Sequence, residues 1–127
     1  SLGVICGYSD QAKSIRNKLR GYKLQSFNRN DDEQFMVDTV DNFQGDERDI
    51  IILSLVRSKP DRSFMTKFNR INVAVSRARC LLVIVGDAKS FSNLNVELDG
   101  KRDYVYRRIV DMTRGRGLVT AKDVLGE

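Results

Sequence analysis

The sequence predicts an α/β fold in which helices cover both faces of a mainly parallel sheet. Two observations support this prediction. Short apolar runs rich in Val, Ile and Leu alternate along the chain with segments of helical period. The run IIILSLV at residues 50–56 is apolar throughout, as is typical of a central parallel strand that is covered on both faces. We therefore expect a three-layer sandwich of helix, sheet and helix.

The expected elements follow in order along the chain. Strands are expected at residues 2–6, 22–27, 35–40, 50–56 and 81–85, where short apolar runs are bounded by polar or Gly-containing segments. Helices are expected at residues 9–20, 64–78 and 103–114, where the apolar residues recur on one face. Residues 28–34 and 58–63 are expected to be polar loops, and residues 90–100 to be irregular.

At 127 residues the chain is long enough for one domain with a substantial core. We place the core of that domain at residues 1–88. Residues 89–127 are expected to form an extension with one amphipathic helix, packed on the same domain. No apolar run is long enough to cross a membrane, and no basic segment precedes the first apolar run as in a secretory signal. Because the chain begins on an expected strand, we expect it to be part of a longer protein.

The composition limits the possible chemistry. Lys and Arg number 22 against 17 Asp and Glu, and this net charge of +5 favours a polyanionic partner without establishing one. The absence of His excludes histidine-based metal sites and acid–base catalysis. Cys6 and Cys80 both lie in apolar runs, so we expect two buried free thiols and an intracellular protein, cytoplasmic or nuclear.

Polar segments follow the expected strands at Tyr8, at residues 41–49 and at Asp87. In a parallel sheet the carboxyl ends of the strands meet at one edge, where ligands bind. We therefore expect a phosphate-binding site at this edge, and we expect Arg77 to touch the phosphates.

Arg70 and Arg77 lie seven residues apart on one face of the expected helix. Two guanidinium groups on one face can clamp phosphate oxygens, and one arginine can stabilise the charge that develops on a transferring phosphoryl group. From spacing alone, the more common outcome is a solvated basic face, or arginines paired with Asp41, Glu47 or Asp49.

The turn NFQGDERD joins two of the expected strands. Gly45 permits a tight bend, while Gln44 and Glu47 offer side chains to a sugar hydroxyl or a polarised water. An ordinary polar turn is the alternative. Four acidic residues could instead hold a divalent metal for nuclease chemistry, but we expect no metal site. The acidic residues concerned are Asp38, Asp41, Glu47 and Asp49.

Two further residues have two possible roles each. Tyr8 follows a strand and precedes a helix, where its ring can stack on a base or pack on the end of the sheet. Thr39 can contact a nucleic-acid phosphate, although Thr is also a good strand residue.

Three segments resemble the motifs of superfamily 1 helicases. TVDNFQGDERDIIILSLVRS resembles the fifth motif, NRINVAVSRARCLLVIVGD the sixth, and GVICGYSDQ, more loosely, the fourth. The branch that the chain resembles most contains the nonsense-mediated-decay helicase and the senataxin-like helicases. The resemblance spans roughly Gly3 to Asp87 and implies the second, C-terminal RecA-like domain of an ATP-dependent helicase, with a fold of the P-loop NTPase type.

The resemblance also implies roles for individual residues. Arg77, in VSRAR, matches the arginine finger that reaches the γ-phosphate of ATP. The other matches are Tyr8 and Gln11 beside the nucleotide, Gln44, Gly45 and Glu47 in coupling the nucleotide to the strand, and Thr39 and Val40 at the nucleic-acid phosphates. We also assign Arg70 to the nucleotide site. The chain departs from the family at Cys6 and Gly7, where Thr-Pro is common.

The chain has no G-x-x-x-x-G-K-[ST] segment, so it lacks its own phosphate-binding P-loop. The resemblance implies that ATP with Mg²⁺ is bound mainly by a first RecA-like domain, which is absent from this chain. The implied partners are that upstream domain and single-stranded DNA or RNA, with no membrane. We expect the isolated chain to be inactive. The alternative function is a non-catalytic nucleic-acid-binding or regulatory module that keeps the same fold.

Overall fold

The computed structural model describes residues 1–20, 35–55, 68–115, 117, 119 and 123. The chain forms two compact units, Ser1–Gly86 and Asp87–Glu127, and each is described by itself. Among the described residues, no helix has the length and apolar character needed to cross a membrane.

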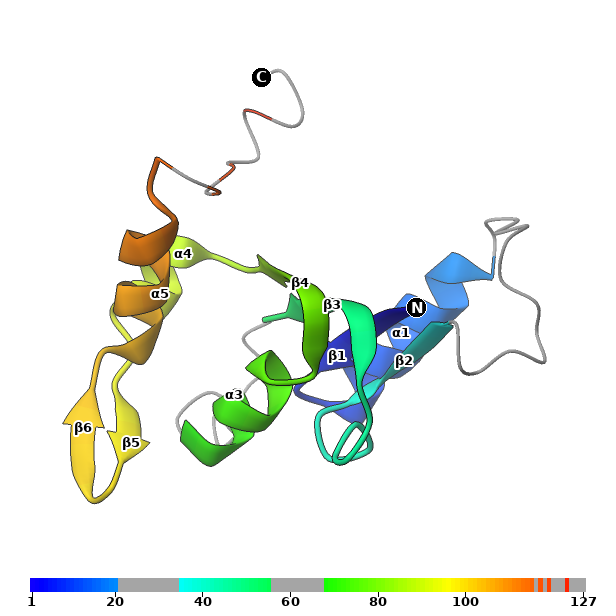
Figure 1. The fold of residues 1–127 in the computed structure, drawn as a ribbon, viewed down its shortest axis with the longest axis horizontal. Helices are drawn as coiled ribbons and strands as arrows, with labels where there is room; N and C mark the ends of the chain where they lie inside the picture. The colour runs from blue at the N-terminus through cyan, green and yellow to red at the C-terminus, as the bar shows by residue number, and fades with distance from the viewer. Residues whose placement is uncertain (21–34, 56–67, 116, 118, 120–122, 124–127) are drawn as a thin grey trace. The chain divides into compact units, whose positions relative to one another are not determined.

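The first unit is built on a four-stranded parallel sheet. Its strands are β1 (Leu2–Cys6), β2 (Phe35–Thr39), β3 (Arg48–Ser54) and β4 (Ala78–Val85), in the order β2-β1-β3-β4. Helix α1 (Ser9–Leu19) lies between β1 and β2 in sequence, and α3 (Phe68–Val75) lies between β3 and β4. The two crossovers run in opposite directions along the sheet, so right-handed connections place the helices on opposite faces. The predicted three-layer α/β arrangement is confirmed (Figure 1).

Helix α1 packs on the half of the sheet formed by β1 and β2. Its Ala12 is fully buried against Val4, Cys6 and Val37, which point to the same face of the sheet. The partly buried side chains around this cluster are Ile15, Leu19, Phe35 and Ile52. This cluster accounts for the apolar spacing of α1, because the buried positions form one stripe of the helix.

The other half of the same face is exposed. Ile52 of β3 packs against the α1 cluster and lies beside Val83 of β4 in the parallel register. Leu81, Val83 and Val85 therefore point to the same face of the sheet that α1 covers over β1 and β2. Leu81 is 51% exposed and Val85 54% exposed. We call Ile50, Leu81, Val83 and Val85 the apolar half-face.

The opposite face of the sheet is covered by the loop of residues 40–47 as well as by α3. Phe43 of this loop is fully buried. A Cβ atom added to Gly3 of β1 would lie 2.8 Å from Ile51 Cδ1 and 2.9 Å from Phe43 Cε1. Only glycine fits at position 3, because the Phe43 ring lies directly over the backbone of β1.

The described part of the second unit contains two short helices and a hairpin. They are α4 (Ala88–Ser92), β5 (Val96–Leu98), β6 (Lys101–Asp103) and α5 (Val105–Thr113), and β5 pairs antiparallel with β6. Asp87 caps α4 by accepting hydrogen bonds from the amides of Lys89 and Ser90. The rings of Phe91 and Tyr106 pack with their centroids 5.1 Å apart.

Several sequence predictions need correction. Residues 90–100 are not irregular, because they contain the end of α4 and the strand β5. Helix α3 ends at Val75 and not at residue 78, so Arg77 lies beyond the helix, and β4 starts three residues earlier than expected. Cys80 is exposed, although a buried thiol was expected. The strand expected at residues 22–27 and the loops at 28–34 and 58–63 lie outside the described residues.

Candidate functional site

The predicted site residues divide between the two ends of the parallel strands. Tyr8, Gln11, Thr39 and Val40 follow β1 or β2 and lie at the carboxyl edge of the sheet. Glu47 and Arg77 precede β3 and β4 and lie at the amino edge. At about 3.3 Å per residue, strands of this length separate the two edges by roughly 15 Å. The expectation that all of residues 41–49 lie at one edge is therefore wrong.

The loop of residues 40–47 runs from the carboxyl edge to the amino edge. The amide of Phe43 donates to the carbonyl of Thr39 at 3.2 Å, and the amide of Asp46 donates to the carbonyl of Phe43 at 2.9 Å. Gly45 has a φ of +82°, in the left-handed region that glycine favours, so the expected tight bend is present. Since Phe43 is buried, the loop presents Gln44, Gly45 and Glu47 to solvent.

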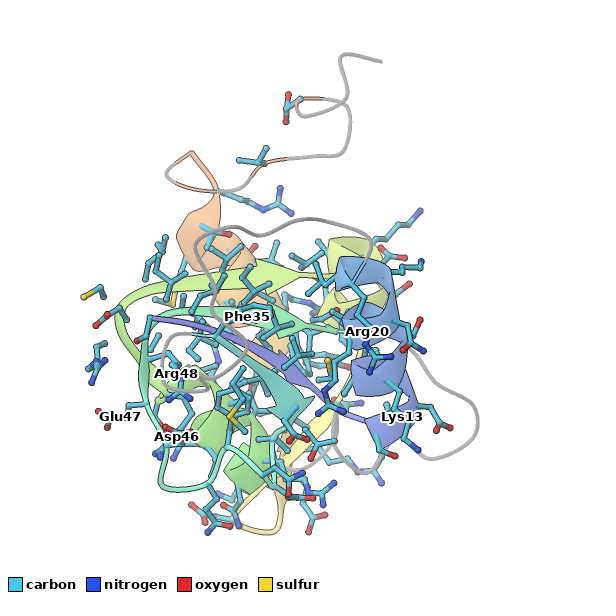
Figure 2. The ribbon with its side chains drawn as sticks, turned by 90° about the vertical axis from the view of Figure 1, so that its right-hand side faces the viewer. Lys13, Arg20, Phe35, Asp46, Glu47 and Arg48 are labelled. Atoms are coloured by element: carbon cyan, nitrogen blue, oxygen red, sulfur yellow. The ribbon has the colours of Figure 1, made fainter. Side chains whose placement is uncertain are left out.

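Arg48, which no sequence argument singled out, lies at the centre of the amino edge. It is the buried charged residue of the described chain, with 7% of its surface exposed. Its Nη1 donates to Oδ1 of Asp46 and, at 2.9 Å, to the carbonyl of Glu47, while its Nη2 lies 3.7 Å from Met36 Sδ. Figure 2 shows Asp46, Glu47 and Arg48 close together and apart from Lys13 of α1 and from Arg20, the C-cap of that helix.

The main chain of Arg48 joins this group to Arg77. The Arg48 amide donates to the carbonyl of Arg77 at 3.0 Å, where β3 and β4 begin to pair. Glu47 and Arg77 are thus on two adjacent segments at the same edge of the sheet.

Among the described residues, the partners of the Arg77 guanidinium are neutral oxygens. Its Nε donates to the carbonyl of Val73 at 3.1 Å, and its Nη2 donates to the hydroxyl of Ser76 at 3.1 Å. Within the described residues Arg77 has no carboxylate partner. By contrast, Arg70 Nη2 pairs with Oδ2 of Asp41 at 2.9 Å, so the expected alternative of an ion pair applies to Arg70 and not to Arg77.

The acidic residues that were considered for a metal site are held separately. Asp38 pairs with Arg16 at 3.3 Å, Asp41 with Arg70, and Asp49 with Arg79 at 3.1 Å. Asp38 and Asp41 lie at or beside the carboxyl edge, whereas Glu47 and Asp49 lie at the amino edge. In the part of the chain that the structure describes, no three potential metal-ligating side chains come together. This placement gives the nuclease alternative no support.

At the carboxyl edge, most of the predicted binding groups are already engaged. Gln11 Nε2 donates to Ser54 Oγ at 2.8 Å. Val40 is buried and its amide donates to the carbonyl of Cys6, while the Thr39 amide donates to Asp38 Oδ1 at 2.8 Å. Tyr8 is half-buried at the N-cap of α1. Of these residues, Thr39 keeps a side-chain hydroxyl at the end of its strand, whereas Val40 contributes its side chain to the core.

A shallow groove of about 690 Å³ runs beside β2, and none of the predicted site residues lines it. It is lined by Arg16, Phe35, Met36, Val37, Asp38, Asp46 and Arg48. Asp46 and Arg48 are thus shared between the groove and the amino edge.

A family model described as "AAA domain" matches residues 1–89, which cover the whole four-stranded sheet. The chain belongs to this AAA domain family. It is 34% identical to Helicase sen1 of Schizosaccharomyces pombe over 128 residues, which is 99% of this chain and 7% of that protein. It is 38% identical to the Regulator of nonsense transcripts 1 homolog of Neurospora crassa over 90 residues, 69% of this chain and 8% of that protein.

A third relative is DNA polymerase alpha-associated DNA helicase A of Saccharomyces cerevisiae, which is 40% identical over 90 residues, 68% of this chain and 12% of that protein. The chain therefore spans only a small part of the relatives that it matches. Together, the AAA domain and these relatives confirm the resemblance drawn from the motifs: this is a C-terminal RecA-like domain of superfamily 1 helicases, in the branch of the nonsense-mediated-decay and senataxin-like helicases.

Proposed function

We propose that the chain is the second motor domain of an ATP-driven helicase or translocase, and that Arg77 is its arginine finger. The observation that carries this proposal is the contrast between the two arginines. Arg70 is neutralised by Asp41, whereas Arg77 is oriented by Val73 and Ser76 and has no carboxylate partner in the described chain. A charged donor that is oriented but not neutralised suits an incoming anion.

The free donors of Arg77 determine what it can do. A guanidinium carries five N–H donors, and the two bonds to Val73 and Ser76 leave three for a ligand. Directed at the γ-phosphoryl group of ATP, they would stabilise the negative charge that develops during transfer. Because the chain has no P-loop, the nucleotide itself would be held by the first motor domain of the longer protein.

Glu47 is the second residue that we assign to the nucleotide. It is exposed at the same edge as Arg77, and its carboxylate can accept hydrogen bonds from ribose hydroxyls. Gln44 and Gly45, which are exposed on the same loop, would couple the nucleotide to the nucleic-acid strand. Tyr8 and Gln11 lie at the opposite edge, so one nucleotide contacts both groups only if it extends along the length of the strands.

For the nucleic acid, we propose Thr39 as a phosphate contact through its hydroxyl. Its position at the end of β2 begins the loop that leads to Glu47, so a single segment would connect the strand to the nucleotide. The relatives include proteins named as a DNA helicase and as an RNA helicase. Binding of nucleic acid should therefore be tested with both single-stranded DNA and single-stranded RNA oligonucleotides.

The first prediction concerns Arg77. In the full-length protein, Arg77→Ala should lower kcat for ATP by about three orders of magnitude or more, since an arginine finger contributes that much to phosphoryl transfer. Binding of a single-stranded oligonucleotide, measured by fluorescence anisotropy, should stay within about twofold of the native value. Arg70→Ala is the matched control, and its effect on kcat should be much smaller because Asp41 already neutralises Arg70. Near-native turnover by Arg77→Ala would contradict the assignment.

The second prediction concerns the isolated chain of 127 residues. Purified alone, it should show no ATP hydrolysis above buffer in a phosphate-release assay, because it has no loop to hold the triphosphate. Adding the separately expressed first motor domain should restore turnover that depends on Arg77. Hydrolysis by the isolated chain, retained in Arg77→Ala, would show that its chemistry lies elsewhere.

A further inference from the structure

Packing of the core does not explain why a charged residue, Arg48, is buried. Removing a guanidinium from water is costly, and an apolar side chain of similar size at a buried site is often as stable or more so. The position nevertheless holds an arginine with 7% exposure, at the start of a strand that continues through Asp49 into an apolar run. Its charge must therefore serve a purpose other than packing.

The side chain of Arg48 binds the two residues that precede it. One nitrogen, Nη1, is shared between the carboxylate of Asp46 and the carbonyl of Glu47. These bonds hold the Asp46 side chain and the Glu47 main-chain carbonyl, directly after the left-handed turn at Gly45. The exposed Glu47 side chain thus projects from a segment whose main chain is tied to a buried group.

Arg48 also connects the Asp46–Glu47 segment to Arg77. The amide of Arg48 is bonded to the Arg77 carbonyl at 3.0 Å, and its Cγ lies 3.1 Å from the place that a Cβ on Gly3 would take. The main chain and the side-chain stem of Arg48 are therefore anchored between the segment that carries Arg77 and the central strand β1, while its guanidinium binds Asp46 and Glu47.

We propose that Arg48 is a positioning residue that holds Glu47 in a fixed place relative to Arg77, so that both act on one nucleotide. This inference rests on the proposed function. The side chain of Arg48 acts through Glu47 and does not itself touch the nucleotide.

The test is a double-mutant cycle in the full-length protein, with kcat/KM for ATP measured at a saturating single-stranded oligonucleotide. Arg48→Met keeps the length and apolar stem of the side chain but removes its donors. It should lower kcat/KM by about tenfold in the native background, which is the typical value of a charge-assisted hydrogen bond. In a Glu47→Gln background the same change should cost less than about twofold, because effects that act through one group do not add.

Equal losses in the two backgrounds would overturn the proposal, since a general loss of stability would act independently of Glu47. If circular dichroism shows that Arg48→Met does not fold, Asp46→Asn is the second variant. It weakens the ion pair between Asp46 and Arg48 from a half-exposed position, and its cycle with Glu47→Gln has the same two outcomes. Arg79→Met is the matched control. Arg79 is an exposed arginine that pairs with Asp49, and its loss should leave kcat/KM within about twofold in both backgrounds.

The cycle also separates this inference from the proposed function. If Arg77→Ala and Glu47→Gln leave ATP turnover unchanged, the proposed function fails. If those two variants are impaired but Arg48→Met is not, the proposed function stands and the positioning role of Arg48 is wrong.

Discussion

Two arginines of the same sequence motif lie in different electrostatic surroundings. Arg70 is paired with Asp41 across 29 positions of sequence, whereas Arg77 is held by a carbonyl and a hydroxyl close to it in the chain. An arginine bonded to neutral oxygens keeps its full charge for a ligand, and its orientation is set before the ligand arrives. The two arginines also differ in their position on the helix. Arg70 lies within α3, whereas Arg77 follows the end of α3 at Val75.

The two cysteines also differ. Burial raises the pKa of the Cys6 thiol to about 11, while Cys80 is exposed on β4. The thiolate is the reactive form, so at pH 8 a pKa of about 11 leaves about one Cys6 thiol in a thousand ionised.

We therefore predict that iodoacetamide at pH 8 alkylates Cys80 of the folded chain well before Cys6. Peptide mass spectrometry after timed quenching measures both positions in one sample. Raising the pH toward 11 should increase the labelling of Cys6 as its thiolate fraction rises. Unfolding in guanidinium is the control and should make the two rates similar. Equal labelling of the folded chain at pH 8 would contradict the buried position of Cys6.

At the scale of the element, the loop of residues 40–47 combines a buried anchor with an exposed surface. Phe43 is fully buried over β1, and the residues on either side of it are exposed. Such a loop can keep a fixed shape without being covered by other elements. Its shape depends on the left-handed turn at Gly45, where a Cβ would meet no other atom within 4 Å.

Gly45→Ala should therefore destabilise the first unit through backbone conformation alone. The left-handed region costs a residue with a Cβ about 1–2 kcal/mol, and the free energy of unfolding should fall by this amount. Urea denaturation followed by circular dichroism measures it. Gly117→Ala is the matched control, because Gly117 also has open space around it but no left-handed φ. A neutral Gly45→Ala would mean that the loop adopts another conformation in solution.

The sequence allowed the elements of the first unit to be predicted because each has a strong period or an unbroken apolar run. Leu2–Cys6 and α1 are examples, and their bounds match the expectation to within a residue. The prediction failed for β5 and β6, which have three residues each, because so short a strand has no measurable alternation. Cys80 was misjudged because an apolar run does not reveal which side of an edge strand is covered.

The candidate site was partly predictable. The motif spacing pointed to Glu47 and Arg77, but it could not show that they lie at the opposite edge from Tyr8. That depends on a loop that crosses the sheet without a helix, which no local pattern encodes. Arg48 was missed because it precedes Asp49 at the start of a strand, where charged residues are usually solvent-exposed.

At the scale of the whole molecule, the apolar half-face is the feature that bears most on behaviour in solution. Contiguous exposed apolar side chains of this kind promote association of a chain that is expressed by itself. Leu81, Val83 and Val85 lie on β4 and Ile50 lies on the neighbouring β3; among the described strands, β4 is at the end of the strand order and is an edge strand.

Leu81→Lys should accordingly reduce concentration-dependent self-association of the 127-residue chain, measured by sedimentation velocity over a range of concentrations. A charge at a half-exposed apolar position blocks association through that face. Asn72→Lys, at an exposed position of α3, adds the same charge elsewhere and should change association much less. Equal effects of the two substitutions would indicate that net charge, and not the half-face, controls association.

The strand order has a consequence for how the first unit folds. Leu2 of β1 pairs with residues 35 and 50, and every pairing in this sheet is parallel. Among the strands that the structure describes, no hairpin can therefore start the sheet, and long loops must close before these strands are hydrogen-bonded. During synthesis, β1 leaves the ribosome before both strands that it pairs with among the described residues, β2 and then β3. We therefore expect slow, late folding, with α1 the earliest element to form.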